Sequence, residues 1–206
     1  MNGLTSLLVI LVILLLIVAV AALVFGLMAH KKQQQQQPAA NFSPQDPFHT
    51  GDADSLRGDP RRLKAGDIVE IRGVPYTVRG SIRLSEGGWT WDEHLLDDAK
   101  GTQLWLEVEE DPDLELSVWT PVEDAGQPGA GTITLNGRTY HLEESGTAHF
   151  RSEATTGLNG EGTVRYYDYE APDGAMLGFE SYGDAEWEAS TGEQLSRYEV
   201  QIYPSA

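Results

Sequence analysis

Three side chains at alternating positions, Trp89, Trp91 and Glu93, form the pattern in this sequence that is best suited to binding chemistry. Residues two apart in a β-strand lie on the same face, so both indoles and the carboxylate would point the same way. An indole face attracts cations, and a nearby carboxylate adds an opposite charge. The pattern therefore predicts a site for an organic cation such as a polyamine, with Glu93 as the best single candidate.

Trp105 and Glu107 repeat this pairing of an indole with a carboxylate later in the chain. They would share one face of a strand, while Leu104, Leu106 and Val108 would occupy the other. Ordinary core packing is the commoner use of such aromatic residues, and the sequence leaves that interpretation open. The candidate ligand-binding residues are Trp89, Trp91, Glu93, Trp105 and Glu107.

The densest acidic stretch of the chain follows directly after these residues. Hard cations take oxygen ligands of this kind, but the stretch lacks the glycine and the spaced glutamate of a calcium loop. We therefore expect no metal ligands here, and we interpret the stretch as a charged edge strand exposed to solvent. Its acidic residues are Glu107, Glu109, Glu110, Asp111, Asp113 and Glu115.

No catalytic arrangement is recognisable in the sequence. His94, His141 and His149 lack the spacing of a zinc site, which predicts isolated core or surface histidines. No serine has a G-x-S-x-G context, and the glycine-rich segment 157–162 lacks the Lys-Ser/Thr of a phosphate loop. We expect a protein that is not an enzyme, with no catalytic residue, metal site or cofactor.

The elements that would position the candidate residues are short strands. From Leu63 onward the chain alternates between apolar and polar residues, and turn signals such as Arg72-Gly73 and Asn136-Gly137 separate the runs. Thr191-Gly192 has the same turn-like character, and no window of this region has a sustained helical period. The sequence predicts an all-β barrel or sandwich of about ten strands.

A faint internal repeat accompanies these strands. Residues 66–78 resemble residues 131–142: in each, a glycine opens an alternating run, a second glycine turns it, and a tyrosine follows. Leu104-Trp105-Leu106-Glu107 and Leu177-Gly178-Phe179-Glu180 then follow at a distance. Two related β halves and chance alternation are both compatible with this pattern.

Charge is divided unevenly along the chain. Residues 1–64 contain six Lys/Arg and four Asp, a net charge of +2, whereas residues 65–206 contain eight Lys/Arg and twenty-eight Asp/Glu, a net charge of −20. So acidic a region repels nucleic acids and anionic lipid head groups, which excludes both as partners of this region. The absence of cysteine excludes disulfides and thiolate chemistry.

The N-terminal residues 1–29 contain no charged side chain and are long enough to cross a bilayer as one helix. They predict a single-pass anchor in the cell membrane, and Lys31 and Lys32 behind it predict a cytoplasmic C-terminal part. Residues 30–62 are rich in Gln and Pro and predict a disordered linker. The acidic β-domain would span residues 63–206.

The domain contains four spaced motifs: Gly66-Asp67-x-Val69, Gly73-x-x-Tyr76-x-Val78-x-Gly80, Trp91-x-Glu93-x-x-Leu96 and Trp105-Leu106. In residue type and spacing they resemble the bacterial family known as domain of unknown function 4178. The resemblance extends over about 140 residues; His94 departs from it, because the family often has an aromatic residue there. The anchor and linker look like those of actinobacterial members. The resemblance implies no catalytic residue, but it implies genomic neighbours: small membrane proteins, a spermidine-synthase-like aminopropyltransferase and, in some cases, phage-shock-type genes.

Two functions follow as expectations. The first is a membrane-tethered, non-enzymatic interaction or scaffold module of a membrane or envelope system, with a protein partner such as a small membrane protein. The second is a sensor or binder of cationic ligands, either a polyamine or a divalent metal. The anchor and tether favour the first, whereas the acidic charge and the Trp/Glu pairs favour the second.

Overall fold

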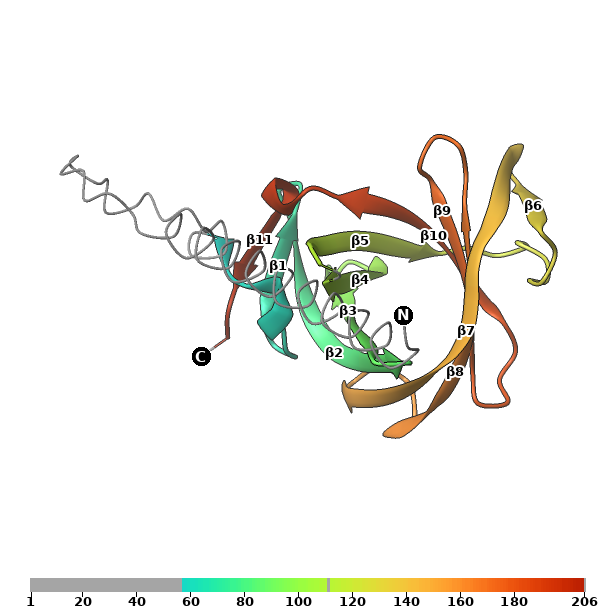
Figure 1. The fold of residues 1–206 in the computed structure, drawn as a ribbon. Helices are drawn as coiled ribbons and strands as arrows, with labels where there is room; N and C mark the ends of the chain where they lie inside the picture. The colour runs from blue at the N-terminus through green and yellow to red at the C-terminus, as the bar shows by residue number, and fades with distance from the viewer. Residues whose placement is uncertain (1–56, 111, 206) are drawn as a thin grey trace, which may run out of the picture. The chain divides into compact units, whose positions relative to one another are not determined.

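The computed structural model describes residues 57–110 and 112–205, which form one eleven-stranded antiparallel sheet (Figure 1). The prediction of an all-β fold is confirmed, with one strand more than the estimate. Besides two 3-10 helices, η1 (Pro60–Arg62) and η2 (Arg197–Glu199), the elements are β1 (Ile68–Ile71), β2 (Val74–Glu86), β3 (Trp89–Asp97), β4 (Gln103–Glu110), β5 (Leu114–Pro121), β6 (Thr132–Leu135), β7 (Arg138–Ala154), β8 (Glu161–Glu170), β9 (Met176–Tyr182), β10 (Glu188–Leu195) and β11 (Val200–Tyr203).

The expected membrane anchor, residues 1–29, lies outside the described residues, as does most of the expected linker. Within the described part of the chain, no helix is long and apolar enough to cross a membrane. The end of the expected linker is described, and Pro60–Arg62 form η1 there.

The sheet closes on itself. Its strand order is β11-β1-β2-β3-β4-β5-β10-β9-β8-β7-β6, and β2 additionally pairs with β7. This pairing, from Gly80–Ala154 to Ser85–His149, joins the two ends of the run from β2 to β7. Eight of the strands therefore form a barrel, with β1 and β11 attached beyond β2 and β6 attached beyond β7 (Figure 1).

The strand order has the symmetry that two related halves predict. Strands β1 to β5 are neighbours in sequence order. Strands β6 to β10 are also neighbours in sequence order, counted from the opposite end of the sheet. Each half begins with a tight hairpin whose two turn residues have positive φ, Arg72-Gly73 in the first half and Asn136-Gly137 in the second. Left-handed backbone at both positions is the requirement of the type I′ turn, which suits Asn-Gly.

Apolar packing lies largely on the outer faces of the barrel strands. On β4, Leu104, Leu106 and Val108 join a core that β1, β11 and Leu63 cover. On β9, Leu177 and Phe179 join a second core with Tyr169 and Leu135. A smaller cluster, which includes Ile82, Phe150 and Val164, lies near the seam between β2 and β7.

Two expectations from the sequence are wrong. Glu107 and Glu109 do not lie on an edge strand, because β4 is paired with β3 on one side and with β5 on the other. Thr191-Gly192 is not a turn but lies inside β10, where Gly192 is paired with Trp119. The glycine fits there because a Cβ on Gly192 would lie 2.6 Å from the Trp119 ring.

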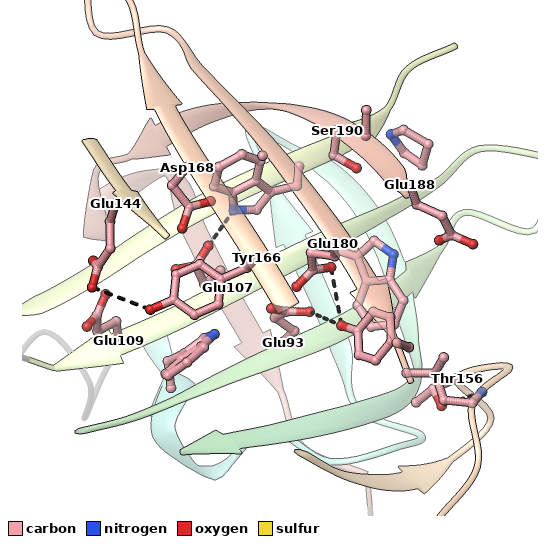
Figure 2. Close-up of a pocket in the computed structure, with 18 of the residues that line it drawn as sticks. Glu93, Glu107, Glu109, Glu144, Thr156, Tyr166, Asp168, Glu180, Glu188 and Ser190 are labelled. Carbon is pink, nitrogen blue, oxygen red and sulfur yellow. Dashed lines mark hydrogen bonds between the residues drawn. The ribbon is translucent and has the colours of Figure 1, made fainter. Parts of the chain in front are cut away.

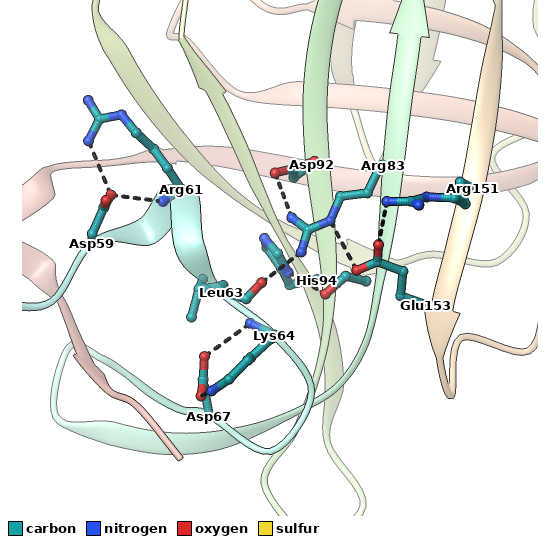
Figure 3. A network of polar contacts seen from close by, with 11 residues as sticks. Asp59, Arg61, Leu63, Lys64, Asp67, Arg83, Asp92, His94, Arg151 and Glu153 are labelled. Carbon is teal, nitrogen blue, oxygen red and sulfur yellow. Dashed lines mark hydrogen bonds and ion pairs between the residues drawn. The ribbon is translucent and has the colours of Figure 1, made fainter. Parts of the chain in front are cut away.

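Polar contacts hold the start of the domain against the outside of the barrel (Figure 3). Arg83 on β2 donates to the carbonyl of Leu63 at 2.8 Å and to Asp92 at 2.6 Å, and it forms an ion pair with Glu153. Asp67, which is only 2% exposed, accepts hydrogen bonds from Lys64 and Ser205. The acidic groups of this network are thus matched by basic groups or backbone donors.

Candidate functional site

The barrel contains a partly open cavity of about 600 Å³, a volume typical of sites for small ligands (Figure 2). An eight-stranded barrel has an interior just wide enough to be filled by side chains or to hold one small ligand. Here the interior contains carboxylates and aromatic rings. The acidic lining residues are Glu86, Glu93, Glu107, Glu109, Glu144, Asp168, Glu180 and Glu188, and the aromatic ones are Trp89, Trp91, Trp105, Trp119, Tyr166 and Tyr182.

Strand alternation and register bring these side chains together. On β4 the residues between the outward leucines, Trp105, Glu107 and Glu109, point into the cavity. Glu107 is directly opposite Glu93 on β3. Residues that face each other across an antiparallel pair have neighbouring side chains, so the first candidate group and the second form one continuous wall.

Trp119 on β5 fixes the position of the Glu107 carboxylate. Its Nε1 donates to Glu107 Oε2 at 2.5 Å, and Ser117 Oγ donates to the same oxygen at 3.1 Å. The indole lies over Gly178 and Gly192, where added Cβ atoms would approach its ring to 3.1 and 2.6 Å. The two glycines therefore provide the space in which this ring can lie flat against the wall.

Tyr182 links two further carboxylates. Its hydroxyl lies 3.4 Å from Glu93 Oε2 and 3.2 Å from Glu180 Oε2. A phenol carries one hydroxyl proton, so it can donate fully to only one of two ionised carboxylates. This arrangement favours a state in which Glu93 and Glu180 hold a proton between them.

Asp168 on β8 points into the same space without a partner (Figure 2). It is partly buried, and no described residue forms a hydrogen bond or an ion pair with its carboxylate. A carboxylate that faces a cavity without a protein partner is available to a ligand that enters the cavity.

Glu86, Tyr166 and Glu144 form a further polar group in the lining. Tyr166 Oη donates to Glu86 Oε2 at 2.6 Å and lies 3.4 Å from Glu144 Oε1. Gly146 allows this contact, because a Cβ there would lie 2.5 Å from the Glu86 carboxylate. Thr156 to Leu158, from the loop between β7 and β8, also line the cavity.

The cavity has no internal counter-charge. Among the described residues that line it there is no Lys, Arg or His. Burial raises the pKa of Glu93, and the charges of Glu180 and Glu107 raise it further. Burial likewise raises the pKa of Asp168 and of Glu107, although hydrogen bonds from Ser117 and Trp119 offset part of the change at Glu107. Taking negative charge out of water without compensation has this effect.

All five candidate residues line this cavity: Trp89, Trp91, Glu93, Trp105 and Glu107. Sequence reasoning missed Trp119, Tyr166, Asp168, Glu180 and Tyr182, which complete the cavity from β5, β8 and β9. Tyr166 and Asp168 are two residues apart, as are Glu180 and Tyr182. This is the same aromatic and acidic spacing as that of Trp91 and Glu93. Trp89 is 57% exposed, so it contributes to the lining with only part of its ring.

Among the described residues, no three acidic or histidine side chains are grouped as a metal site requires. His94 is fully buried on the other face of β3 from Glu93, as a core histidine would be. Its Nδ1 is 2.8 Å from Ser81 Oγ, while its Nε2 has no hydrogen-bond partner. Burial lowers its pKa to about 3, which keeps the ring neutral.

Fold and cavity together define a β-barrel domain with an acidic, aromatic interior, and sequence comparison gives its family. Residues 64–197 match the family described as Domain of unknown function (DUF4178), and the chain belongs to that family.

Curated relatives support the same assignment. The uncharacterized protein Rv2597 of Mycobacterium tuberculosis is 37% identical over 153 residues, which cover 71% of this chain and 74% of the relative. An uncharacterized protein of Aquifex aeolicus is 24% identical over 158 residues, 72% of this chain and 86% of the relative. No solved structure matches the chain.

Proposed function

We propose that the barrel is a binding domain for a small organic cation, which it holds in the acidic, aromatic cavity. The observation that carries the proposal is the imbalance of charge: eight carboxylates line a cavity of about 600 Å³, and no basic side chain among the described lining residues balances them. Buried charge is tolerated when it is paired, so a positively charged ligand is the partner that this interior lacks.

The aromatic lining supports an organic cation over a bare metal ion. Trp and Tyr faces attract ammonium and guanidinium groups and also pack against the carbon atoms that connect them. A divalent metal needs several oxygen ligands converging on one point, an arrangement that the described residues do not provide. Anionic ligands, including nucleic acids, would be repelled by the same carboxylates.

Residues 1–29 supply the second part of the proposal. We propose that this uncharged segment anchors the protein in the cell membrane with a single pass, as in the actinobacterial type of the family. The lysines behind it favour a cytoplasmic barrel. A tethered barrel that binds a cation would act as a sensor or local receptor close to the membrane, rather than as an enzyme.

Calorimetry of the full-length chain in a non-ionic detergent tests the proposal. We expect spermidine to give saturable heat near pH 8 at physiological ionic strength, and Glu107→Gln to weaken the binding at least tenfold. Glu143→Gln is the matched control, because Glu143 is exposed and does not line the cavity. Absence of saturable heat with spermidine, tetramethylammonium and guanidinium would refute the proposal.

A protein-interaction role is the second candidate, and an exposed apolar surface at the edge strand β11 favours it. Tyr203 on β11 is about half exposed, and Tyr198 in η2, just before β11, is 71% exposed. An edge strand has free backbone groups that a partner can pair with. Cross-linking in membranes from a Tyr203 position would test this role, and recovery of no specific product would contradict it.

A further inference from the structure

The two halves of the barrel correspond residue by residue. Counting from the hairpin turns, the bulge between Val78 and Gly80 in β2 lies at the same place as the bulge between Leu142 and Glu144 in β7. Beyond these bulges, Ile82 and Gly146 are equivalent positions. Bulges change which residues face inward, so their agreement keeps both halves in the same register.

This correspondence makes Glu107 and Glu180 equivalent. Ile82 pairs with Glu93, which pairs with Glu107, whereas Gly146 pairs with Tyr166, which pairs with Glu180. Each half of the barrel therefore places one glutamate at the same point of its fourth strand, and both glutamates line the cavity. The cavity contains two carboxylate centres related by the approximate symmetry of the fold.

The two centres have different hydrogen-bond partners. Glu107 is held by Ser117 and Trp119 on β5, while Glu180 lies with Glu93 around the hydroxyl of Tyr182. Strands β5 and β10 separate β4 from β9 in the ring, and Trp119 spans that part of the wall over Gly178 and Gly192. Glu93 is also the cross-strand neighbour of Glu107, so the two centres adjoin. The Trp119 ring beside Glu107 offers an apolar surface to the carbon chain of a ligand with a positive charge at each end.

We propose that the ligand is a linear amine with at least two separated ammonium groups, one bound at Glu107 and the other at the Glu93–Glu180 centre. This proposal rests on the proposed function and specifies its ligand class. The carboxylate of Asp168 is an independent sign of a ligand, since it faces the cavity, is desolvated there and lacks a hydrogen-bond partner in the described part of the chain. One ammonium group would leave one of the two centres without a counter-charge.

The test compares amines that differ only in the number of charges. Titration of the full-length chain in non-ionic detergent would use 1,6-diaminohexane, hexylamine and tetramethylammonium near pH 8. One additional charge-assisted hydrogen bond makes the diamine bind roughly ten- to a hundredfold more tightly than hexylamine. Across α,ω-diamines of increasing length, affinity should pass through a maximum, because the two centres are a fixed distance apart.

Variants assign each end of the ligand. Glu107→Gln and Glu180→Gln should each reduce diamine affinity to about that of hexylamine, while the control Glu143→Gln leaves it unchanged. Circular dichroism of each variant checks that it is folded.

Equal binding of hexylamine and the diamine would overturn this inference and leave the proposed function intact. No binding of any amine or of tetramethylammonium would overturn both. Diamine binding that survives both glutamine substitutions would overturn the assignment of the two centres.

Discussion

Asp67 outside the barrel and Glu180 inside it are buried carboxylates whose pKa values are shifted in opposite directions. Outside the barrel, Asp67 accepts hydrogen bonds from Lys64 and Ser205, and these lower its pKa although burial alone would raise it (Figure 3). Inside the barrel, burial raises the pKa of Glu180 to about 7. Asp67, which has a structural role, has a basic partner, whereas Glu93, Asp168 and Glu180 in the cavity have none among the described residues.

This difference indicates what each group contributes. A carboxylate with a lowered pKa stabilises the folded state at neutral pH, whereas one with a raised pKa destabilises it there. Asp92 is an intermediate case, because burial raises its pKa even though Arg83 offsets part of the effect. The cavity thus reduces the stability of the empty domain, and a bound cation would restore it. Function at the expense of stability is common in binding sites.

The largest expected effect on the free energy of unfolding comes from removing the charge of Asp67 or of Glu180 at neutral pH. Asp67→Asn should lower the free energy of unfolding by about 2–3 kcal/mol, because the buried group loses charge-assisted hydrogen bonds. Glu180→Gln should raise it by about 1–2 kcal/mol near pH 8, because an uncompensated charge is removed. Urea unfolding of the full-length chain in detergent, followed by tryptophan fluorescence, measures both; changes of the same sign would contradict the comparison.

The pH dependence of the free energy of unfolding should show the effects of both Glu180 and Asp67. Between the ordinary pKa of 4.5 and the folded value of about 7, the folded state binds more protons at Glu180 than the unfolded state does. Stability should therefore fall as the pH rises through this window, by roughly 3 kcal/mol for a shift of this size.

Below about pH 4 the opposite trend is expected, because the lowered pKa of Asp67 gives stability that is lost as the pH falls through it. Thermal unfolding from about pH 3 to pH 8 should show a maximum near pH 5, and Glu180→Gln should flatten its alkaline side. A melting temperature that rises steadily toward pH 8 would contradict the raised pKa of Glu180 in the cavity.

The position of Trp119 should depend on the two glycines beneath it. Gly192→Ala should lower the free energy of unfolding by about 1–3 kcal/mol, since its Cβ would overlap a ring that is held on both sides. Gly131→Ala is the control, because nothing lies within 4 Å of its Cβ position and its φ is not positive. Equal melting temperatures for the two variants would show that the ring is not confined.

The smallest effect is expected at the partly exposed end of the lining. Trp89→Ala should change the free energy of unfolding by less than about 0.5 kcal/mol, because the side chain is 57% exposed. Trp105→Ala removes a more buried ring that packs beside the seam cluster, and it should cost more, about 1–2 kcal/mol. Comparable losses in the two variants would mean that Trp89 packs more tightly than its exposure indicates.

Local signals in the sequence predicted local structure well. The hairpin turns at Arg72-Gly73 and Asn136-Gly137 form as the turn residues indicate, and the alternation on β4 separates Leu106 from Glu107 as expected. These features depend on neighbours in the chain. They were sufficient to identify five cavity residues, from Trp89 to Glu107, before any strand was placed.

Features that depend on distant contacts could not be predicted in this way. Closure by β2 and β7 joins segments far apart in the sequence, and it encloses Glu107 where a charged edge strand was expected. Thr191-Gly192 has the composition of a turn, but Trp119 from β5 requires a glycine in the middle of β10. Glu180 and Asp168 also alternate with aromatic residues in the sequence, but only closure of the barrel places them in the same cavity as Glu93 and Glu107.

Proton release on ligand binding tests the central claim most directly. A cation held by the cavity carboxylates favours their ionised forms, so binding near pH 7 must displace protons. Titration of spermidine into the full-length chain, in two buffers that differ in ionisation enthalpy, gives the number of protons released. We predict net release in the wild-type protein and less release in Glu180→Gln. Saturable binding without proton release, or no binding at all, would contradict the account.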